Sequence, residues 1–200
     1  MALDTTERSF TQDQIDKIGN SIIYFSKELN PGLNKTKILK LLFLLEESCI
    51  KNYCYPFFGI DFQLWKYGPV AKDIYIDLSE SAPTLLKDYV KPNGKGDFKA
   101  IKPFNDDEFS DNDIELLKDI TVYAKNKNAK YLVNATHQKG KLWRKSAIKH
   151  GVLDLLENEQ INSTEKIIDF TLLFERDSDA KENYLEFSES MAFIRHLKSE

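Results

Sequence analysis

Long hydrophobic runs are absent from this chain of 200 residues. The longest uninterrupted apolar run covers residues 41–45. A helix needs about 20 apolar residues to cross a bilayer, so we expect no membrane contact. The first ten residues also lack the apolar stretch of a secretory signal, which predicts a cytoplasmic protein.

Cysteine and histidine are both scarce. The two cysteines, Cys49 and Cys54, cannot build a disulfide framework, and their small number fits a reducing compartment. The three histidines, at positions 137, 150 and 196, lack the spacing of a metal site. We therefore expect neither a metal nor a cofactor.

The motifs of common enzyme classes are missing as well. The chain contains no phosphate-binding glycine loop, no dinucleotide-binding glycine motif and no nucleophile elbow around a serine. Cys49 lies in an apolar helical stretch, where a small core residue is the simpler interpretation. A cysteine–histidine pair assembled in space remains open, but nothing in the sequence points to it. We expect a protein that binds and does not catalyse.

What the chain does have is helical periodicity. Apolar residues spaced three and four apart over residues 15–29 predict an amphipathic helix, which begins at a capping box of Thr11 and Gln14. Residues 36–52 are apolar around most of the circumference, as is typical of a buried central helix. Further helices are expected over residues 69–79, 83–89, 110–127, 129–136, 142–150, 164–174 and 182–198, with residues 152–156 as a helix or an arm.

These elements predict a mostly α-helical, compact domain packed around the central helix. The turn signal of residues 92–96 (PNGKG) predicts a small β-hairpin near residues 90–102. The composition changes after Gly151, so we divide the chain into a helical domain, residues 1–151, and a helical C-terminal extension, residues 152–200. The extension either packs on the domain or projects from it.

Residues 62–70 (FQLWKYGPV) form an unusual aromatic segment. Gly68 suits a turn with positive φ, and Pro69 suits the first turn of a helix that runs to about Ser79. A large aromatic side chain is more often buried than exposed, so we place Trp65 in the core and keep a ligand contact as the alternative.

Charge is distributed unevenly, although the net charge is only −4. Residues 125–150 carry eight Lys and Arg and no acidic residue, whereas residues 154–189 carry eleven Asp and Glu against three Lys and Arg. Either the acidic tail folds against the basic segment, or the basic segment is free to attract an acidic partner. Both interpretations stay open at this point.

Three segments together resemble a known family. They are the helical LLFLLEES of residues 41–48, the FQLWKYGPV of residues 62–70, and Ala135-Thr136-His137 followed by Trp143. This combination resembles the Panacea domain, a family of bacterial and phage-associated antitoxins, some of which are similar to proteolytic adaptors. The resemblance covers roughly residues 35–151. Leu142 departs from it, because many members have proline directly before the second tryptophan.

The resemblance implies an antitoxin of a type II toxin–antitoxin pair that neutralises its cognate toxin by direct binding. One alternative is a proteolytic adaptor that delivers the toxin to an ATP-dependent protease. Another, ranked lower, is a nucleic-acid-binding regulator that uses the basic segment of residues 125–149. His137 has a second interpretation, in which its ring caps the carbonyl groups at the end of its helix. The candidate partner-binding residues are Trp65, Tyr67, Pro69, His137, Lys141, Trp143 and Arg144.

Overall fold

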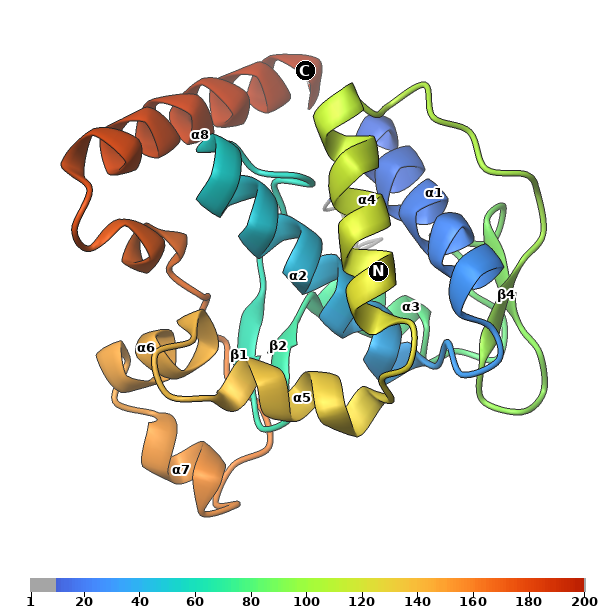
Figure 1. The fold of residues 1–200 in the computed structure, drawn as a ribbon, viewed down its shortest axis with the longest axis horizontal. Helices are drawn as coiled ribbons and strands as arrows, with labels where there is room; N and C mark the ends of the chain where they lie inside the picture. Colours follow the sequence, from blue (N-terminus) through green and yellow to red (C-terminus); the bar gives the residue numbers. More distant parts are fainter. Residues whose placement is uncertain (1–9, 200) are drawn as a thin grey trace, which may run out of the picture.

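The computed structural model describes residues 10–199 and confirms a mostly α-helical fold with two small antiparallel hairpins (Figure 1). The helices are α1 (Gln12–Leu29), α2 (Lys35–Tyr53), α3 (Lys72–Asp77), α4 (Asp111–Ala124), α5 (Ala129–His137), α6 (Leu142–Lys149), α7 (Leu153–Glu157), the 3-10 helix η1 (Phe170–Phe174) and α8 (Ser178–Ser199). The strands are β1 (Gln63–Trp65), β2 (Gly68–Val70), β3 (Val90–Pro92) and β4 (Phe98–Ala100). None of the described helices is long and apolar enough to cross a membrane.

Helix α2 is the centre of the core, as its apolar circumference predicts. It packs against α1, α4, α5 and the β1–β2 hairpin, and Figure 1 shows it running through the middle of the molecule. The Asn34 side chain caps its start, and Cys54 ends it in the left-handed conformation with φ 58°. Helix α1 begins at Thr11, whose side chain and that of Gln14 form the predicted capping box.

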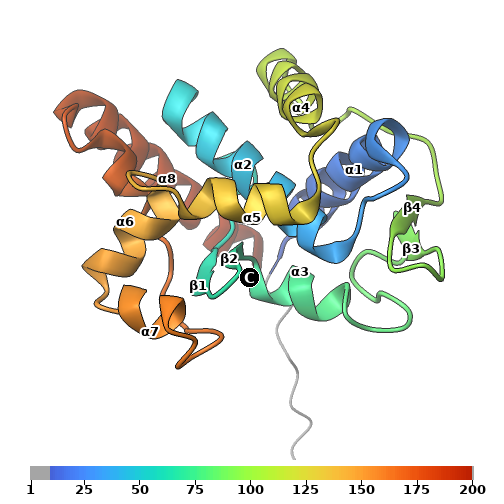
Figure 2. The ribbon, with the colours of Figure 1, turned by 60° about the horizontal axis from the view of Figure 1, so that its bottom comes forward.

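The predicted hairpin near residues 90–102 is confirmed. Strands β3 and β4 pair antiparallel with Val90 opposite Ala100, and they pack against α1. Figure 2 shows this hairpin at one end of the molecule and the β1–β2 hairpin beneath α5.

The expected helix over residues 69–79 is wrong at its start. Gly68 and Pro69 lie in strand β2, which pairs antiparallel with β1, and α3 begins only at Lys72. The Pro69 carbonyl group accepts a hydrogen bond from the buried Lys40 ammonium, with 2.8 Å between Nζ and the oxygen. Strand β2 lies at the edge of a two-stranded ribbon, so no further strand needs a hydrogen bond from residue 69. Proline, which has no N–H group, is therefore tolerated there.

The expected helix over residues 83–89 is also wrong. The Asp77 carboxylate accepts hydrogen bonds from the backbone N–H groups of Thr84, Leu85 and Leu86, at 2.7, 2.7 and 3.0 Å. These donors are therefore satisfied outside a helix, and residues 84–86 form bends.

The expected helix over residues 164–174 forms only as η1. Before it, residues 162–168 run extended alongside β1. Leu64 N–H donates to Lys166 O (2.9 Å), Lys66 N–H donates to Asn162 O (2.9 Å), and Ile168 N–H donates to Phe62 O (2.8 Å). The chain beyond Gly151 thus covers the open edge of β1 before it continues into α8.

Candidate binding groove

The glycine of the aromatic segment allows β2 to lie directly against α5. Gly68 has φ +91°, as predicted, and an added Cβ would lie 2.8 Å from Thr136 Oγ1, 3.0 Å from Lys40 Cε and 3.3 Å from His137 Cε1. Any side chain at this position would therefore push the hairpin away from the helix.

His137 joins the helix to the hairpin turn. Its Nδ1 lies 2.6 Å from Val133 O in its own helix, and its Nε2 lies 2.9 Å from Lys66 O. The ring is therefore at the helix end, where the capping interpretation places it. It adds a contact to the hairpin that the sequence did not predict.

Trp143, and not Trp65, is the tryptophan of the core. Trp143 is 1% exposed, its ring centroid is 3.9 Å from that of His137, and its indole N–H donates to Trp65 O at 3.2 Å. Trp65 is half-buried at the edge of the core, with its ring against Tyr75 and its N–H donating to Gln63 Oε1. The expectation of a buried Trp65 was wrong because β1 turns that side chain toward the surface.

Lys40 is the most unusual member of this region. It is 1% exposed, donates to Pro69 O, and takes part in none of the ion pairs found among residues 10–199. Burial without a carboxylate partner lowers the pKa of Lys40 to about 7. We call Lys40, Gly68, Pro69, His137 and Trp143 the signature cluster, because segments of the family resemblance meet there and hold one another in place.

The predicted partner-binding residues fall into three groups by exposure. Pro69 and Trp143 are buried in the signature cluster and present no side chain to a partner, whereas Tyr67 and Lys141 are exposed. Trp65, His137 and Arg144 are half-buried. A partner-binding role for the accessible members stays a prediction.

The acidic tail covers part of the basic segment. Arg144 pairs with Glu157, Lys145 with Glu175 at 2.8 Å, and Lys149 with Asp169. Burial alone would raise the pKa of Asp169, but Lys149 and Thr171 hold that pKa below its usual value. For helix α6, the internal interpretation of the charge asymmetry is thus confirmed.

The remaining basic residues are not neutralised in this way. Within residues 10–199, no ion pair involves the lysines at positions 125, 127, 130, 139 and 141. Lys127 instead lies over the Tyr123 ring, 3.3 Å from its centroid, and 5.1 Å from that of Tyr131. This side of the molecule therefore combines free positive charge with exposed tyrosine rings.

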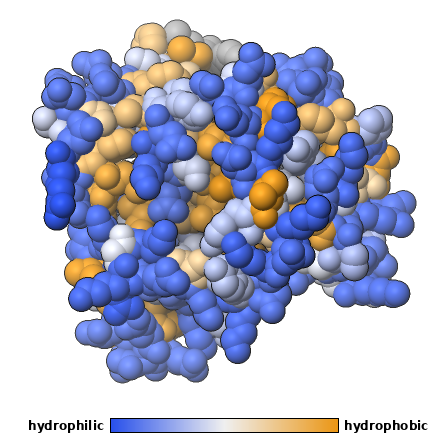
Figure 3. Space-filling view, in the orientation of Figure 1, coloured by the Kyte–Doolittle hydropathy of each residue, from blue (hydrophilic) through white to orange (hydrophobic). Residues whose placement is uncertain are grey.

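A groove of about 420 Å³ opens beside these residues, between α2, α4, the start of α6 and η1. Its lining is mixed: apolar side chains form part of the floor, and charged and polar side chains make up the rest. The main contributors are Leu44, Ile120, Leu172 and Leu173 in the floor and Lys51, Tyr123 and Lys141 at the edge. A smaller cavity of about 100 Å³ continues it along α5 toward Tyr131. On the face drawn in Figure 3, apolar surface gathers in a hollow between the positions of α8 and α6, with hydrophilic side chains around it.

Glu47 adds a carboxyl group to both cavities. Burial raises its pKa, while the positive charges of Lys141 and Lys51 act in the opposite direction. An apolar centre with a polar edge is the usual anatomy of a protein–protein interface, and tyrosine is enriched at its hot spots. The described side chains include no group of three or more potential ligands that could hold a metal ion.

Several groove residues were missed from the sequence. Tyr123 lines the groove and Tyr131 lines the smaller cavity, and with Lys127 between them they repeat every four residues in the sequence. Leu172 and Leu173 gave no signal, because their segment reaches the groove only through the path of the tail along β1.

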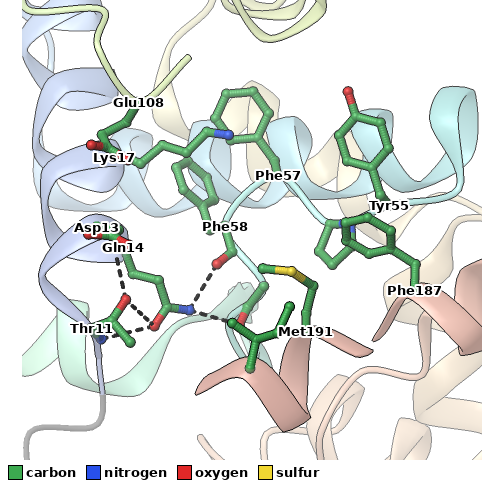
Figure 4. Close-up of a pocket in the computed structure, with 13 residues that line it drawn as sticks. Thr11, Asp13, Gln14, Lys17, Tyr55, Phe57, Phe58, Glu108, Phe187 and Met191 are labelled. Atoms are coloured by element: carbon green, nitrogen blue, oxygen red, sulfur yellow. Dashed lines mark hydrogen bonds between the residues drawn. The ribbon is translucent and has the colours of Figure 1, made fainter. Parts of the chain in front are cut away.

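A second cleft, of about 320 Å³, lies under α8 (Figure 4). Phe187 and Met191 of α8 form one wall, and the aromatic loop of residues 55–58 forms the other. The Phe187 ring lies 5.6 Å from that of Tyr55, and Gln14 Nε2 donates to Phe58 O at 2.9 Å, which fixes the loop to α1. Helix α8 therefore rests on the domain without filling the space beneath it.

Comparison with known proteins gives one match. Residues 38–144 match the family model described as "Antitoxin SocA-like, Panacea domain". The matched region is more than half of the chain and contains the whole signature cluster. Neither the curated proteins nor the solved structures give a match to this chain.

Proposed function

Because the chain belongs to the family of SocA-like antitoxins with a Panacea domain, we propose that it is the antitoxin of a type II pair, which neutralises a protein toxin by binding it directly. The toxin binds in the groove between α2, α4, α6 and η1. The observation that supports this choice is the group of apolar side chains in the groove, Leu44, Leu172 and Leu173, with Lys141 and Tyr123 at its edge.

The groove suits a toxin segment that is apolar at its centre and acidic at its ends. An apolar side chain of the toxin loses its contact with water against Leu44 and Leu172. Carboxylates at the ends meet Lys51 and Lys141. Such charge pairs at the edge mainly raise the association rate, which falls as salt screens them.

Residues beyond the family match contribute to the same surface. Leu172 and Leu173 of η1 form part of the floor, and Glu175 pairs with Lys145 at the margin. We place part of the toxin-specific contact here, because this region lies outside the segment that the family shares.

The first experiment is rescue of growth. The chain is co-expressed with the protein encoded next to it, which should be lethal alone and harmless in the pair. Affinity is then measured by calorimetry for Tyr123→Ala and Lys141→Glu, each of which should weaken binding at least tenfold. Exposed substitutions usually change stability by less than about 0.5 kcal/mol, so both variants should keep a melting temperature within about 2 °C of the wild type.

Lys139→Glu is the matched control. It makes the same charge change two residues away, at an exposed position outside the groove, and should leave affinity nearly unchanged. Unchanged affinity and unchanged salt dependence in Lys141→Glu and Tyr123→Ala would remove the groove from the proposal.

The alternatives give different results in the same cells. An adaptor shortens the half-life of the toxin, and the effect disappears when the ATP-dependent protease is deleted. A nucleic-acid-binding regulator shifts DNA or RNA in a gel at low salt and loses the complex as salt rises. Direct neutralisation predicts a stable toxin in a complex and no such shift.

A further inference from the structure

Helix α8 carries two apolar faces. Successive residues of an α-helix are about 100° apart, so Tyr184, Phe187, Met191 and Ile194 share one face, which covers the cleft of Figure 4. Leu185 and Phe193 lie on the opposite side of the helix. A surface helix that packs on a single domain needs only one apolar face. The second apolar face, with Leu185 and Phe193, is therefore available to bind a partner.

The outer face is exposed and acidic. Leu185 is 40% exposed and Phe193 is 63% exposed. The exposed Glu182, Glu186 and Glu189 fall within the same arc of about 100° as these two side chains. Two apolar anchors eight residues apart on one face are the pattern of a helix that binds in a groove.

A groove of the matching chemistry is present on the same molecule. Its floor offers leucine and isoleucine side chains to Leu185 and Phe193, and its edge offers Lys51 and Lys141 to the glutamates. Glu47 lies in the same lining, but Lys51, Lys141 and Lys145 outnumber it. The α8 outer face and the groove are therefore complementary in polarity and in charge. The acidic outer faces of two α8 helices, in contrast, would repel each other.

We propose that the outer face of α8 binds in the groove of a second copy of this chain, and that two copies related by a two-fold axis make this contact twice. A reciprocal contact of this kind closes into a dimer and leaves neither groove open. The dimer goes beyond the proposed function and does not depend on it. If the toxin uses the same groove, the toxin and the second copy compete for it.

The test uses the full chain alone, without toxin, in size-exclusion chromatography with light scattering from about 1 to 200 μM. The wild type should change with concentration from the chain mass of 23.2 kDa to twice that mass. Two double variants then reverse the charges on either side of the contact: Lys51→Glu with Lys141→Glu in the groove, and Glu182→Lys with Glu186→Lys on α8. Each should be monomeric over the whole range, with an unchanged circular dichroism spectrum.

An equimolar mixture of the two double variants is the decisive sample. In a mixed dimer, each α8 meets a groove of opposite charge, so the mixture should return to twice the chain mass although each variant alone does not. Lys130→Glu with Lys139→Glu makes the same charge change outside the groove and should leave the dimer intact. Leu185→Ser with Phe193→Ser should abolish it.

Three results would overturn the inference: a monomeric wild type at every concentration, a dimer that survives both reversals, or a mixture that stays monomeric. If the wild type is monomeric and Glu182→Lys with Glu186→Lys lowers toxin affinity, the outer face of α8 binds the toxin and not a second copy. Because the dimer is measured without toxin, its failure leaves the antitoxin proposal standing, and failure of toxin binding leaves the dimer standing.

Discussion

The buried lysine of the signature cluster gives a prediction with a distinctive pH dependence. Lys40 has a pKa of about 7 in the folded chain, against 10.5 for an ordinary lysine. Between these two values the unfolded chain binds more protons, so the cost of burying Lys40 grows as the pH falls from 10.5 to 7 and then levels off. At about 1.4 kcal/mol per pKa unit, the full cost is roughly 5 kcal/mol.

Lys40→Met should therefore stabilise the protein near neutral pH. Methionine keeps the length and the apolar stem, and it removes the charge. It also leaves Pro69 O without its donor, which costs about 1–3 kcal/mol. We expect a net gain of about 2–4 kcal/mol at pH 6, which shrinks by about 2–3 kcal/mol on going to pH 9.

Urea denaturation followed by circular dichroism at pH 6, 7, 8 and 9 measures both quantities. Lys118→Met is the control, because Lys118 is exposed on helix α4 and the same substitution there should give a difference that does not depend on pH. If the difference between Lys40→Met and the wild type is the same at every pH, Lys40 keeps its ordinary protonation and the argument from burial fails.

Four further substitutions test the signature cluster and the elements near it. Gly68→Val should prevent the hairpin from docking on α5, because φ is positive and there is no room for a Cβ, and the variant should be largely insoluble or melt far below the wild type. Trp143→Ala should lower the free energy of unfolding by about 3–5 kcal/mol, and the half-buried Trp65→Ala by only about 1–2 kcal/mol; equal losses would contradict the burial described here. Asp77→Ala removes the acceptor of three backbone N–H groups, so amide exchange at residues 84–86 should accelerate by at least tenfold while exchange in α2 changes little.

The sequence predicted those features whose causes are local. The capping box of Thr11 with Gln14 joins residues three positions apart, and helix α1 begins there as expected. Helix α4 begins at the expected position too, with Ser110 and Asp113 forming its capping box. The apolar circumference of residues 36–52 identified the central helix, because no surface helix carries that pattern. The positive φ of Gly68 was predicted from its position in a Tyr-Gly-Pro turn.

The failures involve partners outside the segment concerned, from Asp77 with Thr84, seven residues apart, to bonds that join distant parts of the chain. Lys40 and Pro69 are 29 residues apart, and Thr164 Oγ1 donates to the carbonyl group of Leu64, 100 residues away. Such bonds determine whether a segment becomes a helix or an extended strand, and periodicity within the segment does not report them. The groove was only partly predicted, through Lys141, for the same reason: its walls come from four separate elements.

The extended segment of residues 162–168, which covers the edge of β1, has a consequence for the timing of synthesis. The edge of β1 stays uncovered until those residues are made, about one hundred positions after β1 itself. At roughly 5–20 residues per second, a ribosome leaves that edge open for about 5–20 s. An open edge pairs readily with other strands, so the nascent chain is at its most vulnerable to mispairing in this interval. A chain released before residues 162–168 are made would keep that edge of β1 exposed.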